Sequence, residues 1–118
     1  MTPEAIELAN LACEACTGSA ERLILTDLEQ YAGEVPQWSV IDAVRLERTF
    51  EFPDFRAALE FVNRVGDLAE RDQHHPDIHL SYGKVRVELF THKVHGLTRN
   101  DFILASKIDR VHNKHSHG

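Results

Sequence analysis

The sequence predicts an α+β fold in which helices pack on one face of a four-stranded antiparallel sheet, in the order α-β-β-α-β-β-α. Three patterns carry this prediction. Residues 44–52 alternate between apolar and polar side chains, as strands of a half-exposed sheet do. Residues 55–72 repeat apolar side chains at helical spacing. Residues 78–91 form two β-prone runs around Gly83. Two hairpins and their helices can then bury their apolar faces together.

The bulk composition fits one globular domain over residues 1–118. The chain has 118 residues, of which 42% are hydrophobic and 27% charged. No apolar run approaches about eighteen residues, and no basic flank follows Met1. We therefore expect no membrane span, no signal peptide and a cytoplasmic location.

The charge is uneven along the chain. The net charge is −6, but residues 1–70 hold 5 basic and 14 acidic side chains, whereas residues 71–118 hold 8 and 5. This balance offers no strong basic patch to neutralise phosphates, so bulk nucleic-acid binding is disfavoured and a small-molecule substrate fits better.

Both terminal segments lie outside the main pattern. Residues 1–18 form an N-terminal extension that contains Cys13-Glu14-Ala15-Cys16. Such a pair is half of a zinc site or a redox centre, but no second pair and no βαβ unit accompany it. Structural or incidental thiols are favoured. Residues 113–118 lack apolar side chains, so we expect a frayed tail and no designed metal site there.

Helices are expected before the first strand. Thr2-Pro3 is a sound helix start for a short helix to about Ala12. Ser19 is the next N-cap candidate, and Gly33 closes that second helix. Its apolar positions at helical spacing are Ile24, Leu25, Leu28 and Tyr31.

The first hairpin and the central helix cover residues 38–72. A β-prone run at 38–41 leads through the turn Asp42-Ala43 into the alternating strand. Pro53-Asp54 ends that strand, and Asp54 caps an amphipathic helix over residues 55–72. Gly66 inside this helix is a position that would permit close packing.

The second hairpin follows this helix. His75 precedes Pro76, which disfavours the α region for His75 and ends the helix. Residues 78–82 and 84–91 then pair around Gly83. In the second strand Val85, Val87 and Leu89 share the core-facing parity, so His92 falls on the other face.

The C-terminal helix starts at a sequence that resembles a capping box, Thr98-Arg99-Asn100-Asp101. Its apolar stripe consists of Phe102, Leu104, Ala105, Ile108 and Val111.

The histidines indicate where the chemistry lies, because all eight fall between His74 and His117. Histidine is the side chain whose ordinary pKa lies nearest neutral pH. Two kinds of site compete for His74, His75 and His92. A zinc site would use all three, but adjacent histidines on an extended chain point to opposite faces. Metal-free general acid–base catalysis on a small polar substrate is therefore favoured.

Two carboxylates have alternative roles at this site. Asp101 or Glu70 could orient a histidine ring and favour its protonated form. Alternatively, Asp101 only caps the last helix and Glu70 is surface charge. A capping role for Asp101 does not exclude a second one.

These residues carry a resemblance. Glu70-xxx-His74-His75-Pro76, five residues, Tyr82, nine residues, His92, eight residues and Asp101 resemble the signature of the pterin-4a-carbinolamine dehydratases. The resemblance covers roughly residues 20–112 and includes Trp38, while the C-x-x-C segment resembles only a bacterial-type subgroup. It implies the family fold, a four-stranded antiparallel sheet with helices on one side.

The resemblance also implies a function. The enzyme would remove water from 4a-hydroxytetrahydrobiopterin, give the quinonoid dihydropterin, and recycle the cofactor of aromatic amino acid hydroxylases. No metal or organic cofactor is implied. His74, His75 and His92 would bind the pterin and transfer protons, and Glu70, Asp101 and Trp38 would line its pocket. A homo-oligomer, dimer or tetramer, is expected. The alternative is a non-catalytic binding or dimerisation module, like a transcriptional coactivator, that uses the face of the helix over residues 55–72.

Overall fold

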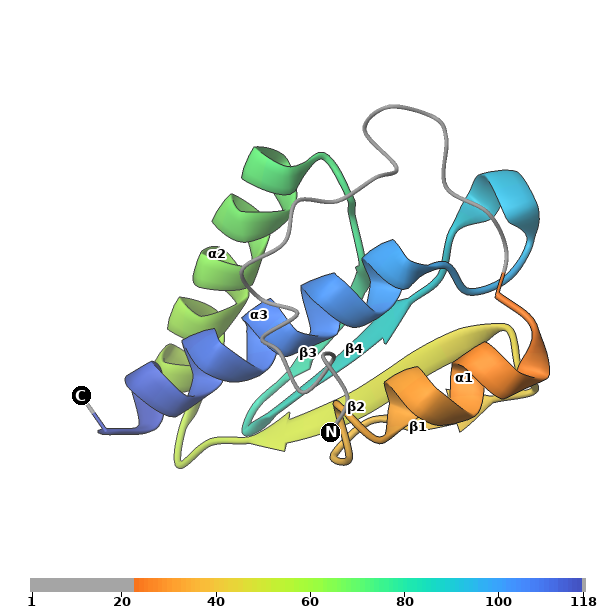
Figure 1. The fold of residues 1–118 in the computed structure, drawn as a ribbon. Coiled ribbons are helices and arrows are strands. Elements are labelled where there is room, and N and C mark those ends of the chain that lie inside the picture. Colours follow the sequence, from red (N-terminus) through yellow and green to blue (C-terminus); the bar gives the residue numbers. More distant parts are fainter. Residues whose placement is uncertain (1–22, 118) are drawn as a thin grey trace.

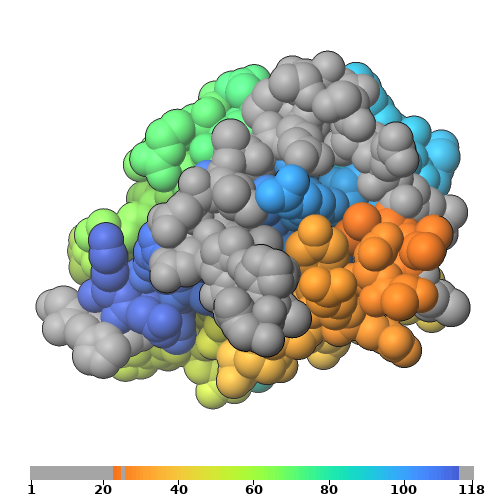
Figure 2. Space-filling view, viewed as in Figure 1, coloured from red at the N-terminus to blue at the C-terminus, as the bar shows by residue number. Residues whose placement is uncertain are grey.

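The computed structural model describes residues 23–117. The four strands form one antiparallel sheet in the order β1-β2-β4-β3, and the three α-helices lie on one face of it (Figure 1). The same view in space-filling form shows these helices at the surface of the molecule (Figure 2). The predicted fold class and element order are confirmed. The elements are α1 Leu25–Ala32, β1 Ser39–Ile41, β2 Arg45–Glu51, α2 Phe55–Asp72, β3 Asp77–Ser81, β4 Lys84–Leu89, the 3-10 turn η4 His92–Val94 and α3 Arg99–His117.

The core lies between the sheet and the helices. Leu46 and Phe50 of β2 stand opposite Leu89 and Val85 of β4, and all four side chains are buried. Phe61 of α2 packs on Phe50, with 4.7 Å between ring centroids. The alternating pattern therefore predicted the correct buried face, because a one-residue slip would have turned these side chains toward solvent.

The turn and the cap that flank β2 also agree with the prediction. Asp42 and Ala43 have φ values of 52° and 59°, and the Val44 N–H donates to Ile41 O at 2.9 Å, so the predicted turn joins the two strands. Asp54 accepts a hydrogen bond from the backbone N–H of Ala57 at 2.8 Å and caps α2. Helix α2 begins and ends at the predicted residues.

One side of α2 is not covered by the described residues 23–117. Phe55 and Leu59 keep 45% and 38% of their surface exposed. A Cβ placed on Gly66 meets nothing within 4 Å. Gly66 therefore makes no close packing contact within the described part of this chain, and any role in close packing must involve another surface.

Two predictions about the first helix have different outcomes. The expected helix to Ala12 and the proposed cap at Ser19 lie outside the described residues. Helix α1 starts at Leu25, with Ile24 at the N-cap and no side-chain hydrogen bond there. Gly33 ends the helix as predicted, but in the right-handed region, with φ −65°.

The predicted strand over residues 84–91 is too long. Strand β4 ends at Leu89. His92 begins the 3-10 turn η4, so the face of the strand does not set the direction of its side chain. The backbone N–H of Thr91 donates to Gly96 O at 2.8 Å and thereby closes a tight loop. This local pairing takes the place of a strand partner and turns the chain away from the sheet.

Helix α3 continues to His117. The expected fraying of residues 113–118 stays a prediction. Within residues 23–117, none of the helices is both long and apolar enough to cross a bilayer.

Candidate active site

A buried histidine–carboxylate pair joins the end of α2 to the start of α3. His74 Nε2 lies 2.6 Å from Asp101 Oδ1. His74 is 7% exposed and Asp101 is 0% exposed. The left-handed conformation of Gln73, with φ 55°, ends α2 and turns the chain, and the His74 backbone N–H then donates to Ala69 O at 3.2 Å. The turn at Gln73 therefore places the ring under the N-terminus of α3.

Three donors converge on the Asp101 carboxylate. Besides His74, the Thr91 hydroxyl donates to Oδ2 at 2.8 Å, and the Thr98 backbone N–H donates to Oδ2 at 2.9 Å. The hydroxyls of Thr91 and Thr98 are 3.0 Å apart. Asp101 thus caps α3 as predicted and also holds a histidine. The two roles use different carboxylate oxygens, so they do not compete.

This network selects a tautomer of His74. An ionised carboxylate only accepts hydrogen bonds, so the Nε2 of His74 carries the proton that faces Asp101. In the neutral ring Nδ1 is then an acceptor, and in the protonated ring it is a donor. His74 can therefore take or give a proton at Nδ1 without losing its contact with Asp101.

A second, exposed pair lies beside the first. His75 Nε2 is 2.5 Å from Glu70 Oε2, with 55% and 75% of the two side chains exposed. Both residues lie at the C-terminal end of α2, and the Gln73 side chain donates to Glu70 O at 2.6 Å. The Nε2 of each adjacent histidine is thus engaged by a carboxylate, which leaves Nδ1 of each for other partners.

His92 lies next in the chain to the buried network, because its neighbour Thr91 is bonded to Asp101. Its side chain is exposed and packs against Phe90, with 4.3 Å between ring centroids. The structure thus brings together His74 with Asp101 and His75 with Glu70. His92 is adjacent to Thr91 in the chain, but its described side-chain contact is with Phe90 and not with either pair.

Trp38 lies apart from these pairs. It is 5% exposed, and its indole N–H donates to Asp109 Oδ1 at 2.8 Å. Asp109 also pairs with Arg48 at 2.6 Å. Burial raises the pKa of the Asp109 carboxyl, and the contacts with Trp38 and Arg48 oppose that rise. Asp109 follows Asp101 by eight residues, or about 12 Å along a helix. In this chain the Trp38 side chain packs in the core. Its assignment as a substrate-binding residue stays a prediction.

Sequence reasoning missed the two threonines of the network. Thr91 and Thr98 are both buried. The alternation of the preceding strand could have indicated Thr91, because it shares the parity of Val85, Val87 and Leu89. Among residues 23–117 no group of three or more histidine, cysteine or acidic side chains is arranged to hold a metal ion.

Comparison with known proteins identifies the family. The sequence model described as pterin 4 alpha carbinolamine dehydratase matches residues 21–111, which include all six candidate residues. The chain belongs to this family.

Curated relatives agree with this membership. A protein from Rubrobacter xylanophilus, provisionally named pterin-4-alpha-carbinolamine dehydratase, is 48% identical over 105 residues, which are 89% of this chain and 98% of that protein. A relative from Chlorobium limicola with the same provisional name is 44% identical over 109 residues, covering 90% and 96% of the two chains.

Solved structures share the pterin dehydratase fold. A protein from Brucella melitensis, described as a transcriptional coactivator/pterin dehydratase, superposes with a TM-score of 0.73 and 29% identity, over 77% of this chain and 98% of that one. A pterin dehydratase-like protein described as a RuBisCO assembly factor in the alpha-carboxysome has a TM-score of 0.51 and 20% identity, over 57% and 77%. At that identity the second similarity shows the fold alone.

Proposed function

We propose that this chain is a 4a-hydroxytetrahydrobiopterin dehydratase that works by metal-free histidine general acid–base catalysis. It would give the quinonoid dihydropterin and serve the recycling of tetrahydrobiopterin for aromatic amino acid hydroxylases. The observation that carries the proposal is the buried His74–Asp101 pair, at 2.6 Å, in a chain of this family.

The reaction needs two proton transfers. The C4a–O bond breaks as a protonated imidazole gives its proton to the departing hydroxyl, which leaves as water. A neutral imidazole accepts the proton from the adjacent ring N–H, and the electron pair of that bond forms the new C=N bond. Each positioned transfer contributes roughly 10²–10⁴ in rate. His74 and His75 both present Nδ1 for this work, because Asp101 and Glu70 occupy their Nε2 atoms.

Of the six candidate residues, four have distinct supporting roles in this proposal. Asp101 and Glu70 orient the two rings through their Nε2 atoms. His92 supplies a third imidazole for pterin binding and proton transfer. Trp38 would contribute to the pocket only indirectly, through the packing of α3. The acid and base roles remain shared among the histidines.

The test is spectrophotometry with a freshly generated carbinolamine. His74→Ala and His92→Ala should each lower kcat by about tenfold or more with the fold intact. His79 on β3 and His95 after η4 are matched controls, since neither belongs to the network, and alanine there should change little. Activity should persist after exhaustive chelation. Loss of activity on chelation would disprove the metal-free mechanism.

A second candidate is a protein-binding module. Its support is the uncovered side of α2, where Phe55 and Leu59 are exposed and Gly66 leaves room for close approach. The Brucella melitensis protein is described as both coactivator and dehydratase. We propose that this face of α2 mediates self-association into a dimer or tetramer. Turnover by the wild type and its loss in His74→Ala would favour the enzyme over a silent module.

A further inference from the structure

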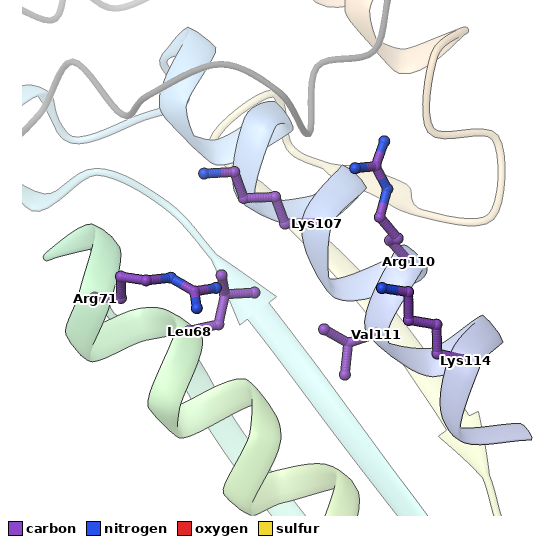
Figure 3. A pocket seen from close by; sticks show the side chains of 6 residues that line it. All are labelled: Leu68, Arg71, Lys107, Arg110, Val111 and Lys114. Atoms are coloured by element: carbon purple, nitrogen blue, oxygen red, sulfur yellow. The ribbon is translucent and has the colours of Figure 1, made fainter. Parts of the chain in front are cut away.

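The fold creates a basic groove that sequence analysis did not predict. It lies between α2 and α3 and has a volume of about 270 Å³. Leu68 and Val111 lie between the helices, and Arg71 faces the α3 side chains across them (Figure 3). Four of the described lining residues are cationic and none is acidic. The lining consists of Leu68, Arg71, Lys107, Arg110, Val111 and Lys114.

This clustering runs against the composition of the chain, whose net charge is −6. Lys107, Arg110 and Lys114 follow at spacings of three and four residues, so they share one side of α3. These side chains therefore concentrate positive charge along one side of α3, next to Arg71 of α2.

Helix dipoles explain only part of the cluster. Arg71 lies in the last turn of α2 and Lys114 in the last two turns of α3, where cations are favourable. Lys107 and Arg110 lie too far from the C-terminus of α3 for this effect, which fades within the last turn. Asp72 holds Lys107 at 2.7 Å with both side chains mostly covered, so this ammonium has a fixed place at the groove.

We propose that this groove binds a small ligand that carries a diphosphate group. Guanidinium groups match phosphate oxygens with two parallel hydrogen bonds, and ammonium groups add point charges. Two arginines and two lysines around an apolar floor suit two linked phosphates with a compact organic part. The volume is near the lower limit for ligand pockets, about 300 Å³, so the site fits a small head group. The site lies outside the proposed catalytic network, whose six residues include none of the groove's.

The test is calorimetric titration of the full chain with pyrophosphate, at low and matched ionic strength. Wild type should bind one equivalent in a saturable manner, and more tightly than it binds inorganic phosphate. Arg71→Gln combined with Lys114→Gln should weaken binding by about tenfold or more, as expected for lost charge-assisted hydrogen bonds. Arg56→Gln combined with Arg64→Gln is the control, because it removes the same charge from exposed positions on α2. It should retain wild-type affinity.

Amide chemical shifts should locate the ligand. Pyrophosphate should perturb resonances around Arg71, Lys107, Arg110 and Lys114. Absence of saturable binding would overturn the proposal, as would equal weakening in the control. Perturbation centred on another basic region, such as Lys84 and Arg86 on the sheet, would also overturn it. None of these measurements requires pterin turnover, so failure of the proposed enzyme activity would leave this test valid.

Discussion

The substitution Asp101→Asn offers a direct test of the buried network. The Thr98 backbone N–H can only donate, so the amide oxygen must occupy the place of Oδ2. The amide nitrogen then replaces Oδ1 beside His74 Nε2, where it donates a hydrogen bond. Two N–H groups cannot face each other at 2.6 Å. His74 must therefore move its proton to Nδ1 and accept at Nε2.

The cost should appear in catalysis more than in folding. The acceptor for Thr98 and Thr91 is kept, so the free energy of unfolding should fall by less than about 2 kcal/mol, the upper range for a lost cap. The neutral ring can no longer accept a proton at Nδ1. We expect kcat to fall by about 10²–10⁴, the contribution of one positioned proton transfer.

Two measurements check this reasoning, kcat with the generated carbinolamine and the ¹⁵N chemical shifts of the His74 ring. Asp101→Ala is the structural control. It leaves buried donors on Thr91 and Thr98 without this acceptor and should cost about 3 kcal/mol or more. The reasoning is refuted if Asp101→Asn keeps the Nε2–H tautomer. A folded variant with kcat within about twofold of wild type would refute it as well.

Three further predictions follow from the structure. Thr91→Val removes one donor to Asp101 and should lower the free energy of unfolding by about 1.5–3 kcal/mol in denaturant unfolding. Thr91→Ser should recover most of the loss. Equal effects of both substitutions would contradict a hydrogen-bonding role. Asp109 has a pKa raised above its ordinary 3.8, so its contribution to stability is present at low pH and is lost as pH rises through the folded-state pKa. The free energy of unfolding of wild type relative to Asp109→Asn should therefore decline across that acid window, and a parallel pH dependence of the two would argue against the shift. Leu59→Lys on α2 should reduce the mass in solution toward that of a monomer. Gln37→Lys at an exposed loop should leave the mass unchanged. An unchanged mass in both variants would place self-association on another surface.

The fold was predictable because each element has a local signal that its environment supports. The alternation in β2 and β4 matches their buried faces, and Asp54 caps α2 where the sequence places it. The end of β4 was not predictable in this way. The pairing of Thr91 with Gly96 is a contact between loop residues, and it has no periodicity that a sequence could display.

The sequence by itself determined the fold class, the span of α2 and the candidate histidines and carboxylates. These follow from side-chain type and spacing, which are properties of the chain before it folds. Only the folded structure decided that Asp101 is hydrogen-bonded to His74, that Glu70 is hydrogen-bonded to His75, and that Trp38 donates to Asp109. It also gathered cations from two helices into one groove. Glu70 and His75 lie five residues apart at the end of α2, so the turn after that helix brings them together. The other contacts join residues whose elements meet only when the helices pack on the sheet, and that packing fixes the distances between their side chains.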